Sequence, residues 1–386
     1  MRLIQFAVFF SIVLTIYSLV NYYIFSRGLR TFEQGTLLRT FFISGFWLLV
    51  STFILGRVLE KVYLSHLSDL FTWLGSFWLA AMLYLFLAVV LVDIVRLANY
   101  FVPFLHRFDE TFLFKNPQWI TIGIATTVFF VVLAGHINAL HPRIHSITID
   151  TGLKSEQRSE LRFVMASDIH LGTIISTKRL SKIVSQINDL QPEVVLFPGD
   201  ILDEDLAPVI RQNLGQLLTG IKAPMGIIGS TGNHEYIGGA DAAVKYLSTH
   251  GLTILRDSMM QLTDKVYVAG REDIESKRFG GVARKSLKEI SGLRPEGSFL
   301  IVLDHQPRAI PEAIENKAGL VLSGHTHHGQ MWPLNYITSA MFPVSWGHKL
   351  FEETHVYVSS GLGTWGPPVR IGNRPEIVVF TLLFNK

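Results

Sequence analysis

The sequence predicts an all-α bundle of about four transmembrane helices over residues 1–140, followed by an α/β domain over residues 141–386. Composition supports the first part. The chain is 49% hydrophobic and only 17% charged, whereas a typical soluble domain has about 25% charged residues. The apolar excess lies before about residue 140. Patterning supports the second part, because short β-rich runs alternate with charged helical stretches, as in βαβ units.

Four apolar runs in the first part match a bilayer-spanning helix, which needs about 20 residues, with a range of roughly 17–25. They cover residues 3–25, 40–56, 71–92 and 119–135. The first run could instead be a signal peptide. Its apolar part is long for one and no small-residue cleavage site follows, so we expect an uncleaved helix. The two short runs could alternatively be buried core helices.

Four spans place both chain ends on the same side of the membrane, and we expect a multi-pass protein of the cell membrane. The loops after the first and third runs carry slightly more Arg and Lys than the opposite side. The positive-inside rule therefore favours an extracytoplasmic C-terminal domain. The segment 97–118 mixes aromatic, basic and acidic residues, which fits either a helix on the membrane surface or a connecting loop.

Composition also excludes several classes of function. The chain has no cysteine, so disulfides, thiolate zinc sites and cysteine nucleophiles are excluded together. The net charge of +3 is too small to indicate nucleic acid as a partner. Neither a Gly-x-Ser-x-Gly elbow nor a phosphate-binding P-loop motif occurs, so a serine nucleophile and nucleotide-driven work are not indicated. The sequence leaves the oligomeric state open.

Alternating and apolar patterns predict the secondary structure of the second part. The predicted helices cover residues 176–190 and 240–250. The predicted strands are Leu161–Ala166, Val194–Pro198, Met225–Ser230, Leu252–Leu255, Val266–Ala269, Phe299–Leu303, Gly319–Leu322 and His355–Val358.

Metal-ligand side chains follow five of these strands. Asp168, Asp200 and Asn233 are separated by about one βαβ unit of roughly 30 residues, so parallel strands would carry them to one edge of a sheet. The five clusters are MASDIHLG with Asp168 and His170, FPGDILDED with Asp200 and Asp203, STGNHEY with Asn233, His234 and Glu235, LDHQP with Asp304 and His305, and LSGHTHHGQ with His325, His327 and His328.

Carboxylate, imidazole and amide oxygen ligands together suit Mn, Fe or Zn, and the lack of thiolate disfavours a structural zinc site. Each cluster alone has a simpler interpretation. Gly-Asp and Gly-Asn-His are usually turns, and His305 could be an ordinary core histidine. Because all five follow strands, we interpret them together as a metal site. Gly199, Gly232 and Gly324 precede the ligands, where the chain must turn sharply.

These motifs resemble those of the calcineurin-like metallophosphoesterases. The forms LDHQP and GHTHHGQ and the tail GLGTWGPPVRIGNRPEI are similar to the bacterial membrane-associated branch of that family. The resemblance covers about residues 146–384. It implies a metallophosphoesterase-type four-layer α/β/β/α sandwich.

The resemblance also implies a binuclear centre with two divalent metal ions. The first ion would be held by Asp168, His170, Asp200 and His327. The second would be held by Asp200, Asn233, His305 and His325, so that Asp200 bridges the two. His234 would face the phosphate and protonate the leaving oxygen or stabilise its charge, and Asp203 would orient His234.

This sequence departs from the family pattern at three places. Many members have an arginine after the second-motif aspartate, whereas here the neighbour is Glu204. An arginine that binds the substrate phosphate would come from elsewhere, and Arg370 and Arg271 are the candidates, unless they have a plain surface role. His328 stands where relatives often have glycine, and it either lines the site or is solvated.

The expected chemistry follows from two ions about 3.5–4 Å apart, which can clamp the attacking and leaving oxygens of an in-line displacement. Metal-bound hydroxide would hydrolyse a phosphomonoester, phosphodiester or pyrophosphate bond with inversion at phosphorus. The spans favour a lipid or lipid-linked substrate presented by the bilayer. The segment 331–351 is rich in Trp, Phe, Met and Leu, and we interpret it as a loop that either contacts acyl chains or covers a small satellite core.

Two other classes of function stay open from sequence alone. The chain could be a metal-binding membrane sensor without turnover, although a sensor could lose ligands that are all retained here. It could also be an accessory module of a transport system. Asp93 and His136 lie near span ends, but charges inside the spans, which mark transport pathways, are lacking.

Overall fold

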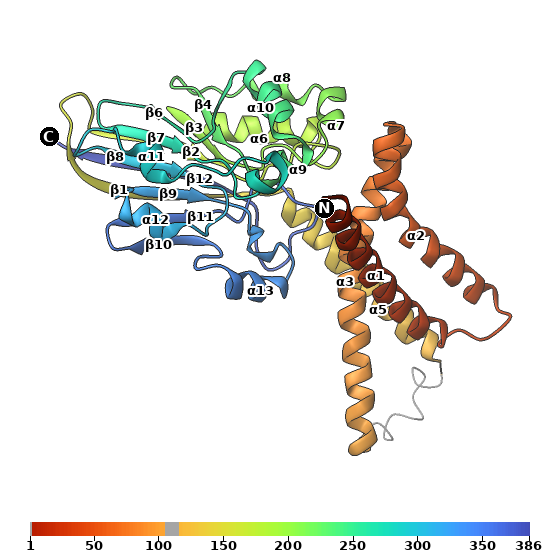
Figure 1. Cartoon of the computed structure of the whole chain (residues 1–386). Coiled ribbons are helices and arrows are strands. Elements are labelled where there is room, and N and C mark those ends of the chain that lie inside the picture. The colour runs from red at the N-terminus through yellow and green to blue at the C-terminus, as the bar shows by residue number, and fades with distance from the viewer. Residues whose placement is uncertain (1, 105–115) are drawn as a thin grey trace. The chain divides into compact units, whose positions relative to one another are not determined.

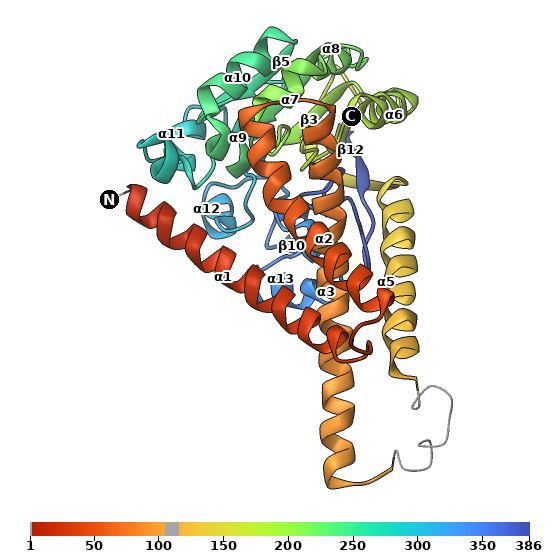
Figure 2. The same ribbon diagram turned by 90° about the vertical axis from the view of Figure 1, so that its right-hand side faces the viewer.

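The computed structural model describes residues 2–104 and 116–386, without the side chains of residues 2–7, 9 and 10. It divides into two compact units, Met1–Gly135 and His136–Lys386. The helices of the first part are α1 (Arg2–Leu29), α2 (Leu37–Val62), α3 (His66–Phe101) and α5 (Pro117–Ala139) (Figures 1 and 2).

Three of these helices, α2, α3 and α5, are long and apolar enough to cross a membrane. They contain the predicted spans 40–56, 71–92 and 119–135. The predicted span 3–25 falls within α1, whose side chains are only partly described, and α1 is not among those three helices. Of the segment 97–118, the first residues end α3, while residues 105–115 lie outside the described residues.

Polar groups between the helices of the first unit have partners. The indole nitrogen of Trp78 donates to Asn21 Oδ1 at 3.1 Å. Asp93 accepts from the Tyr23 hydroxyl at 2.7 Å and from Arg27 Nε at 2.8 Å. An unpaired polar group costs free energy in an apolar environment. These hydrogen bonds pair the polar groups and join α1 to α3 within the unit.

The second unit contains two six-stranded sheets, in the orders β1-β12-β2-β3-β4-β5 and β10-β11-β9-β8-β7-β6. The first sheet consists of β1 (Arg143–Lys154), β12 (Glu376–Asn385), β2 (Glu160–Met165), β3 (Val194–Pro198), β4 (Ile227–Ser230) and β5 (Leu252–Leu255). The second consists of β10 (Gly347–Phe351), β11 (Thr354–Val358), β9 (Leu320–Ser323), β8 (Phe299–Leu303), β7 (Val266–Gly270) and β6 (Ser258–Gln261).

Helices cover the outer faces of the two sheets (Figure 1). The first sheet carries α6 (Thr177–Asp189), α7 (Leu206–Arg211), α8 (Leu214–Leu218), α9 (Asn233–Gly238) and α10 (Ala240–Thr249). The second carries α11 (Leu287–Ser291) and α12 (Ile310–Glu315), and α13 (Leu334–Met341) follows β9. The result is the predicted four-layer α/β/β/α sandwich.

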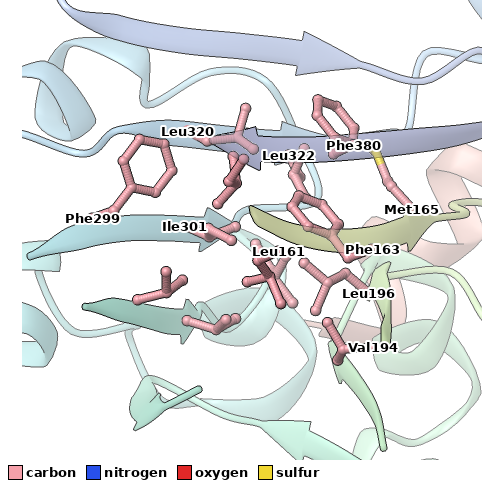
Figure 3. Packing of buried hydrophobic residues seen from close by; sticks show 14 of the residues in the cluster. Leu161, Phe163, Met165, Val194, Leu196, Phe299, Ile301, Leu320, Leu322 and Phe380 are labelled. Atoms are coloured by element: carbon pink, nitrogen blue, oxygen red, sulfur yellow. The ribbon is translucent and has the colours of Figure 1, made fainter. Parts of the chain in front are cut away.

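The main core lies between the two sheets (Figure 3). Side chains alternate between the faces of a strand: Ile301 of β8 points into this core, whereas its neighbours Leu300 and Val302 pack against α11 and α12. Phe163 and Phe380 stack with ring centroids 5.0 Å apart and join β2 to β12. This rigid double sheet fixes the strand ends that carry the polar clusters.

The sequence prediction of a loop over 331–351 is wrong. The segment contains α13 and strand β10. α13 has no buried residue, so its helix is not signalled by a periodic buried face. Its side chains Tyr336, Ile337 and Met341 are exposed.

Candidate metal centre

The strand pairing brings the predicted ligands to one edge of the double sheet. β2, β3 and β4 are paired in parallel, as are β8 and β9. Parallel strands end at the same edge, so the turns after β2, β3 and β4 meet those after β8 and β9. All seven predicted ligands lie in these turns or at the start of α9. Five of them are buried, and Asn233 and His325 are partly buried.

The first group of donors consists of Asp168, His170 and His327. His170 Nε2 and His327 Nε2 face each other at 3.0 Å. Asp168 Oδ1 lies 3.5 Å from His327 Nε2. Two imidazoles and a carboxylate thus point their ligand atoms at one small volume.

The second group consists of Asp200, His305 and His325. His305 Nε2 lies 3.1 Å from Asp200 Oδ2. The amide oxygen of Asn233 joins this group, at 3.2 Å from His305 Nε2 and 2.7 Å from His325 Nδ1. Asn233 therefore supplies the fourth ligand-type atom.

Asp200 lies between the two groups. The same oxygen that faces His305, Oδ2, is 3.8 Å from His170 Nε2 in the first group. Its other oxygen accepts a hydrogen bond from the backbone of His234 at 2.9 Å. One carboxylate is therefore shared by both donor groups, in the position of a bridging ligand.

His234 stands beside the donor groups. Its Nδ1 lies 3.2 Å from Asp203 Oδ1, and its ring meets that of His170 edge-on at 4.5 Å between centroids. The His234 ring also meets Trp365 edge-on, with centroids 5.8 Å apart. Burial lowers the pKa of His234, but the negative charges of Asp200 and Asp203 outweigh it and raise the pKa to about 9.

The backbone at the donors is strained. Five of the seven donors have positive φ: Asp168 at 53°, His170 at 51°, Asp200 at 49°, His325 at 68° and His327 at 46°. A residue with a Cβ pays about 1–2 kcal/mol for this left-handed conformation. Such strain concentrates at functional sites, where the surrounding structure holds it in place.

Close backbone approach explains two of the glycines in the motifs. A Cβ at Gly232 would collide with Asp200, and a Cβ at Gly324 would collide with Asp168 and Ser167. Any larger residue at either position would push a carboxylate out of its donor group.

Glu235 fixes the turn that carries Asp200. Its buried carboxylate accepts from the backbone nitrogens of Gly232 at 2.7 Å, Leu202 at 2.9 Å and Asp200 at 3.1 Å. Burial and the charge of Asp200 raise its pKa to about 7. Glu235 stands in the STGNHEY cluster, and a glutamate at the third position of a helix is a known signal for capping of its start.

The chemistry of the donors fits metal ions. Asp168 Oδ2 is buried and has no hydrogen-bond partner among the described residues. Burial lowers the pKa of His170 to about 4 and that of His325 to about 3, so both imidazoles are neutral near pH 7. Burial raises the pKa of Asp168 to about 6. Imidazole and carboxylate suit transition metals, which bind imidazole in its neutral form.

Arg370 lies behind the first donor group and does not reach into it. The side chain is fully buried. Its guanidinium donates to the carbonyls of Ser360, Gly361 at 3.2 Å and Gly363 at 2.7 Å, and to that of His327 at 3.3 Å. Nη2 also lies 3.1 Å from His327 Nδ1. These contacts hold the loop around His327, whereas we expected Arg370 at the substrate.

Arg271, the other expected substrate-binding arginine, has carboxylate partners. Nη1 lies 2.6 Å from Glu312 and 3.3 Å from Asp304, and the side chain is buried. Asp304 also accepts from Arg284 at 2.9 Å. The LDHQP turn is thus anchored by Asp304 and two arginines, while its His305 points to the donors.

His328 turns away from the donor groups. Its Nδ1 lies 3.1 Å from Ser345 Oγ, and its ring packs against Trp346 at 5.4 Å between centroids. Asn373, another residue that the sequence analysis passed over, donates to the carbonyls of His327 at 3.2 Å and His328 at 3.0 Å. Nothing in the spacing of Asn373 signals that contact.

Comparison with known proteins agrees with the fold and the site. Residues 161–329 match the family model of the calcineurin-like phosphoesterases. A zebrafish "Transmembrane protein with metallophosphoesterase domain" is 34% identical over 280 residues, which cover 69% of this chain and 62% of that protein. An "Uncharacterized metallophosphoesterase" of Aquifex aeolicus is 30% identical and covers 66% of this chain and 98% of its own length.

A metallophosphoesterase of Campylobacter jejuni is 28% identical over 99% of this chain and 100% of its own length, so the similarity there includes the helical part. The zebrafish match spans less than two thirds of that protein. Fold and site together define a metal-dependent phosphoric ester hydrolase. This chain belongs to the calcineurin-like metallophosphoesterase family.

Proposed function

We propose that this chain is a membrane-anchored phosphoesterase with a binuclear metal centre, which hydrolyses a phosphate ester or pyrophosphate bond of a lipid or lipid-linked substrate. The observation that carries the proposal is the sharing of Asp200 between the two donor groups. In this proposal Asp168, His170, Asp200 and His327 hold one ion. Asp200, Asn233, His305 and His325 hold the other.

Two divalent ions of the Mn, Fe or Zn type would activate water and neutralise the phosphate charge. The protein's own part is positional. His234 lies beside both groups with its Nδ1 on Asp203, which leaves Nε2 for the leaving oxygen. Asp203 keeps the ring in that orientation and stabilises its protonated form, as the orienting carboxylate does in other acid–base pairs.

Arg370 acts in this proposal as a positioning residue. Replacement of Arg370 by lysine is expected to lower the affinity of the site for its metal about 10- to 100-fold, the usual cost of losing a group that orients a ligand. A single ammonium cannot serve the carbonyls and His327 together. Titration of the metal-free protein with Mn²⁺, followed by calorimetry, measures the loss.

Arg294→Lys is the control for the Arg370 variant, because Arg294 also donates to backbone carbonyls, at 2.6 Å to Asn316, and lies in a loop beside α11. Unchanged metal affinity in Arg370→Lys, with the fold intact by circular dichroism, would remove Arg370 from the centre.

Exposed apolar side chains beside the centre support a lipid substrate. Tyr336, Ile337 and Met341 of α13 are 65%, 55% and 56% exposed, and Trp365, which faces His234, is 52% exposed. α13 follows directly on the turn that carries His325 and His327. Soluble proteins rarely expose such groups together, and they mark contact with membranes or ligands.

The substrate class is tested with the full-length, metal-loaded protein and detergent-solubilised lipid extracts. Release of phosphate or of a head group is the expected result. Hydrolysis confined to water-soluble esters would exclude a lipid substrate, and no hydrolysis of any ester would favour a sensor.

The apolar surface of α13 gives a sharper test. The double variant Ile337→Asp and Met341→Asp is expected to slow hydrolysis of a lipid ester in vesicles about tenfold or more, because each side chain loses its apolar contact with the bilayer. The rate on a soluble chromogenic diester should stay the same. Val282→Asp with Leu293→Asp, which are 72% and 98% exposed, is the matched control. Equal rates for both double variants on vesicles would exclude a contribution of α13 to hydrolysis of the lipid substrate.

The location of the protein is also a proposal. The apolar helices α2, α3 and α5 support an integral membrane protein, and the distribution of basic residues supports an extracytoplasmic catalytic unit in the cell membrane. Digestion of intact cells by an added protease is expected to release the second unit. Protection until the cells are lysed would place it on the cytoplasmic side.

A further inference from the structure

A cavity of about 300 Å³ lies in the second unit outside the donor groups. Two arginines, Arg143 and Arg374, line it together with His145, His328 and Trp346. This volume is at the lower end of the range of ligand sites, about 300–1,000 Å³. It suits a small polar group such as a phosphate with its glycerol.

The cavity is built by the starts of two neighbouring strands. Arg143 is the first residue of β1 and pairs in register with Glu376, the first residue of β12. Arg374 precedes Glu376 by two residues. Since β1 and β12 are parallel, both arginines lie at the same edge of the sheet. β12 runs antiparallel to β2, so this is also the edge at which β2 delivers Asp168.

The positive charge of the cavity is only partly offset within it, by Glu376, whose Oε2 lies 3.4 Å from His145 Nε2. Glu376 is the one acidic group among its lining residues. That carboxylate is buried, and it accepts from Ser360 N at 2.7 Å, from Tyr357 at 3.1 Å and from the Trp346 indole at 3.1 Å. In the described part of the chain, no carboxylate lies within ion-pair distance of Arg143 or Arg374. Two guanidiniums beside an aromatic wall favour an anion, which each can hold with two parallel hydrogen bonds.

The position of the cavity in the chain points to a membrane source for that anion. Asn138, in the last turn of α5, lines the cavity and donates to the carbonyls of Arg370 at 2.9 Å and Asn373 at 2.7 Å. Arg143 follows the end of α5 by four residues, which span at most about 14 Å. Residues this close to the end of a bilayer-spanning helix lie at the level of the lipid headgroups, where arginine and tryptophan are favoured.

We propose that this cavity binds the phosphate of an anionic phospholipid headgroup, as a site separate from the metal centre. The lipid phosphate would enter the cavity from the membrane surface and bind Arg143 and Arg374, with Trp346 at the interface. The site does not require turnover and stands whether or not the catalytic substrate is a lipid. Basic pockets at the ends of membrane helices bind anionic lipids by the same physics.

The test uses the full-length, metal-free protein in detergent, so that no lipid can be hydrolysed. Native mass spectrometry measures the binding of phosphatidylglycerol against phosphatidylcholine, with glycerol phosphate and inorganic phosphate as separate competitors. We expect one phosphatidylglycerol per chain in preference to phosphatidylcholine. The variant Arg143→Gln with Arg374→Gln should weaken it about tenfold or more, since each arginine near the headgroups contributes separately.

Arg162→Gln with Arg278→Gln is the matched control, because these two exposed arginines lie outside the cavity and the change in net charge is the same. Arg143→Lys with Arg374→Lys keeps the charge without the paired hydrogen bonds, and we expect intermediate binding. Equal weakening by the control pair would reduce the effect to net charge and overturn the site. If inorganic phosphate displaced the bound phosphatidylglycerol as effectively as more lipid does, free phosphate would be the ligand. Absence of a preference for phosphatidylglycerol would refute an anion site.

Discussion

Asp200→Asn is expected to abolish turnover and to weaken both metals at once. The change is nearly isosteric, and an amide oxygen can still accept from the backbone of His234, as Asp200 Oδ1 does at 2.9 Å. What is lost is Oδ2, which faces both His305 and His170. Loss of a group that merely orients a ligand costs about 10- to 100-fold, so loss of a shared ligand should cost more than about 100-fold.

The measurement is hydrolysis of bis-p-nitrophenyl phosphate by metal-loaded protein, with metal content determined on the same sample. Asp205→Asn is the control. Asp205 lies in the same turn and caps α7 by accepting from Ala207 N at 2.9 Å, which asparagine does equally well. A variant at Asp200 that kept full metal content and the original rate would remove Asp200 from the bridging position.

His234→Asn is expected to slow hydrolysis without loss of metal. His234 carries a proton near pH 7, because Asp200 and Asp203 raise its pKa to about 9 despite its burial. General acids contribute about 10²–10⁴-fold. An alkyl ester, whose leaving oxygen needs that proton, should therefore lose about this factor, and a p-nitrophenyl ester should lose far less.

Comparison of the two leaving groups separates an acid from a ligand. His250→Asn, at the end of α10, is the matched control, since the His250 ring bonds locally, to Tyr246 O at 2.8 Å and Thr249 Oγ1 at 3.5 Å. Equal losses on both esters, or a fall in metal content, would contradict the role of His234 as the acid.

The strands that carry donors were predictable because each is a short apolar run bounded by a turn. β3 and β8 begin and end at the predicted residues. β1 escaped prediction because it lies at the edge of its sheet with a mostly exposed pattern. β12 is a strongly apolar strand that the same rule identifies, but it is missing from the predicted strands. The parallel pairing then brought the donors together, as their spacing indicated.

The direction of a long side chain does not follow from the sequence. A motif places the Cα of Arg370 near the ligands but does not say which way the guanidinium points. In the structure the guanidinium points inward and contacts His327, Ser360, Gly361, Gly363 and Asn373. The same holds for Arg271, whose partners Asp304 and Glu312 lie 33 and 41 residues away. Contacts at that separation depend on the fold and leave no local pattern.

The last turn of α5 has a consequence for any soluble form of this protein. His136 bonds the carbonyl of Pro368 at 2.7 Å, Asn138 bonds the carbonyl of Arg370, and Arg179 of α6 donates to Ala139 O at 2.8 Å. The loop held in this way is the one that carries Arg370 to His327. A fragment that began at residue 141 would discard these bonds and free the loop behind His327, a proposed metal ligand. We therefore expect the point at which α5 is cut to affect how tightly the second unit binds metal.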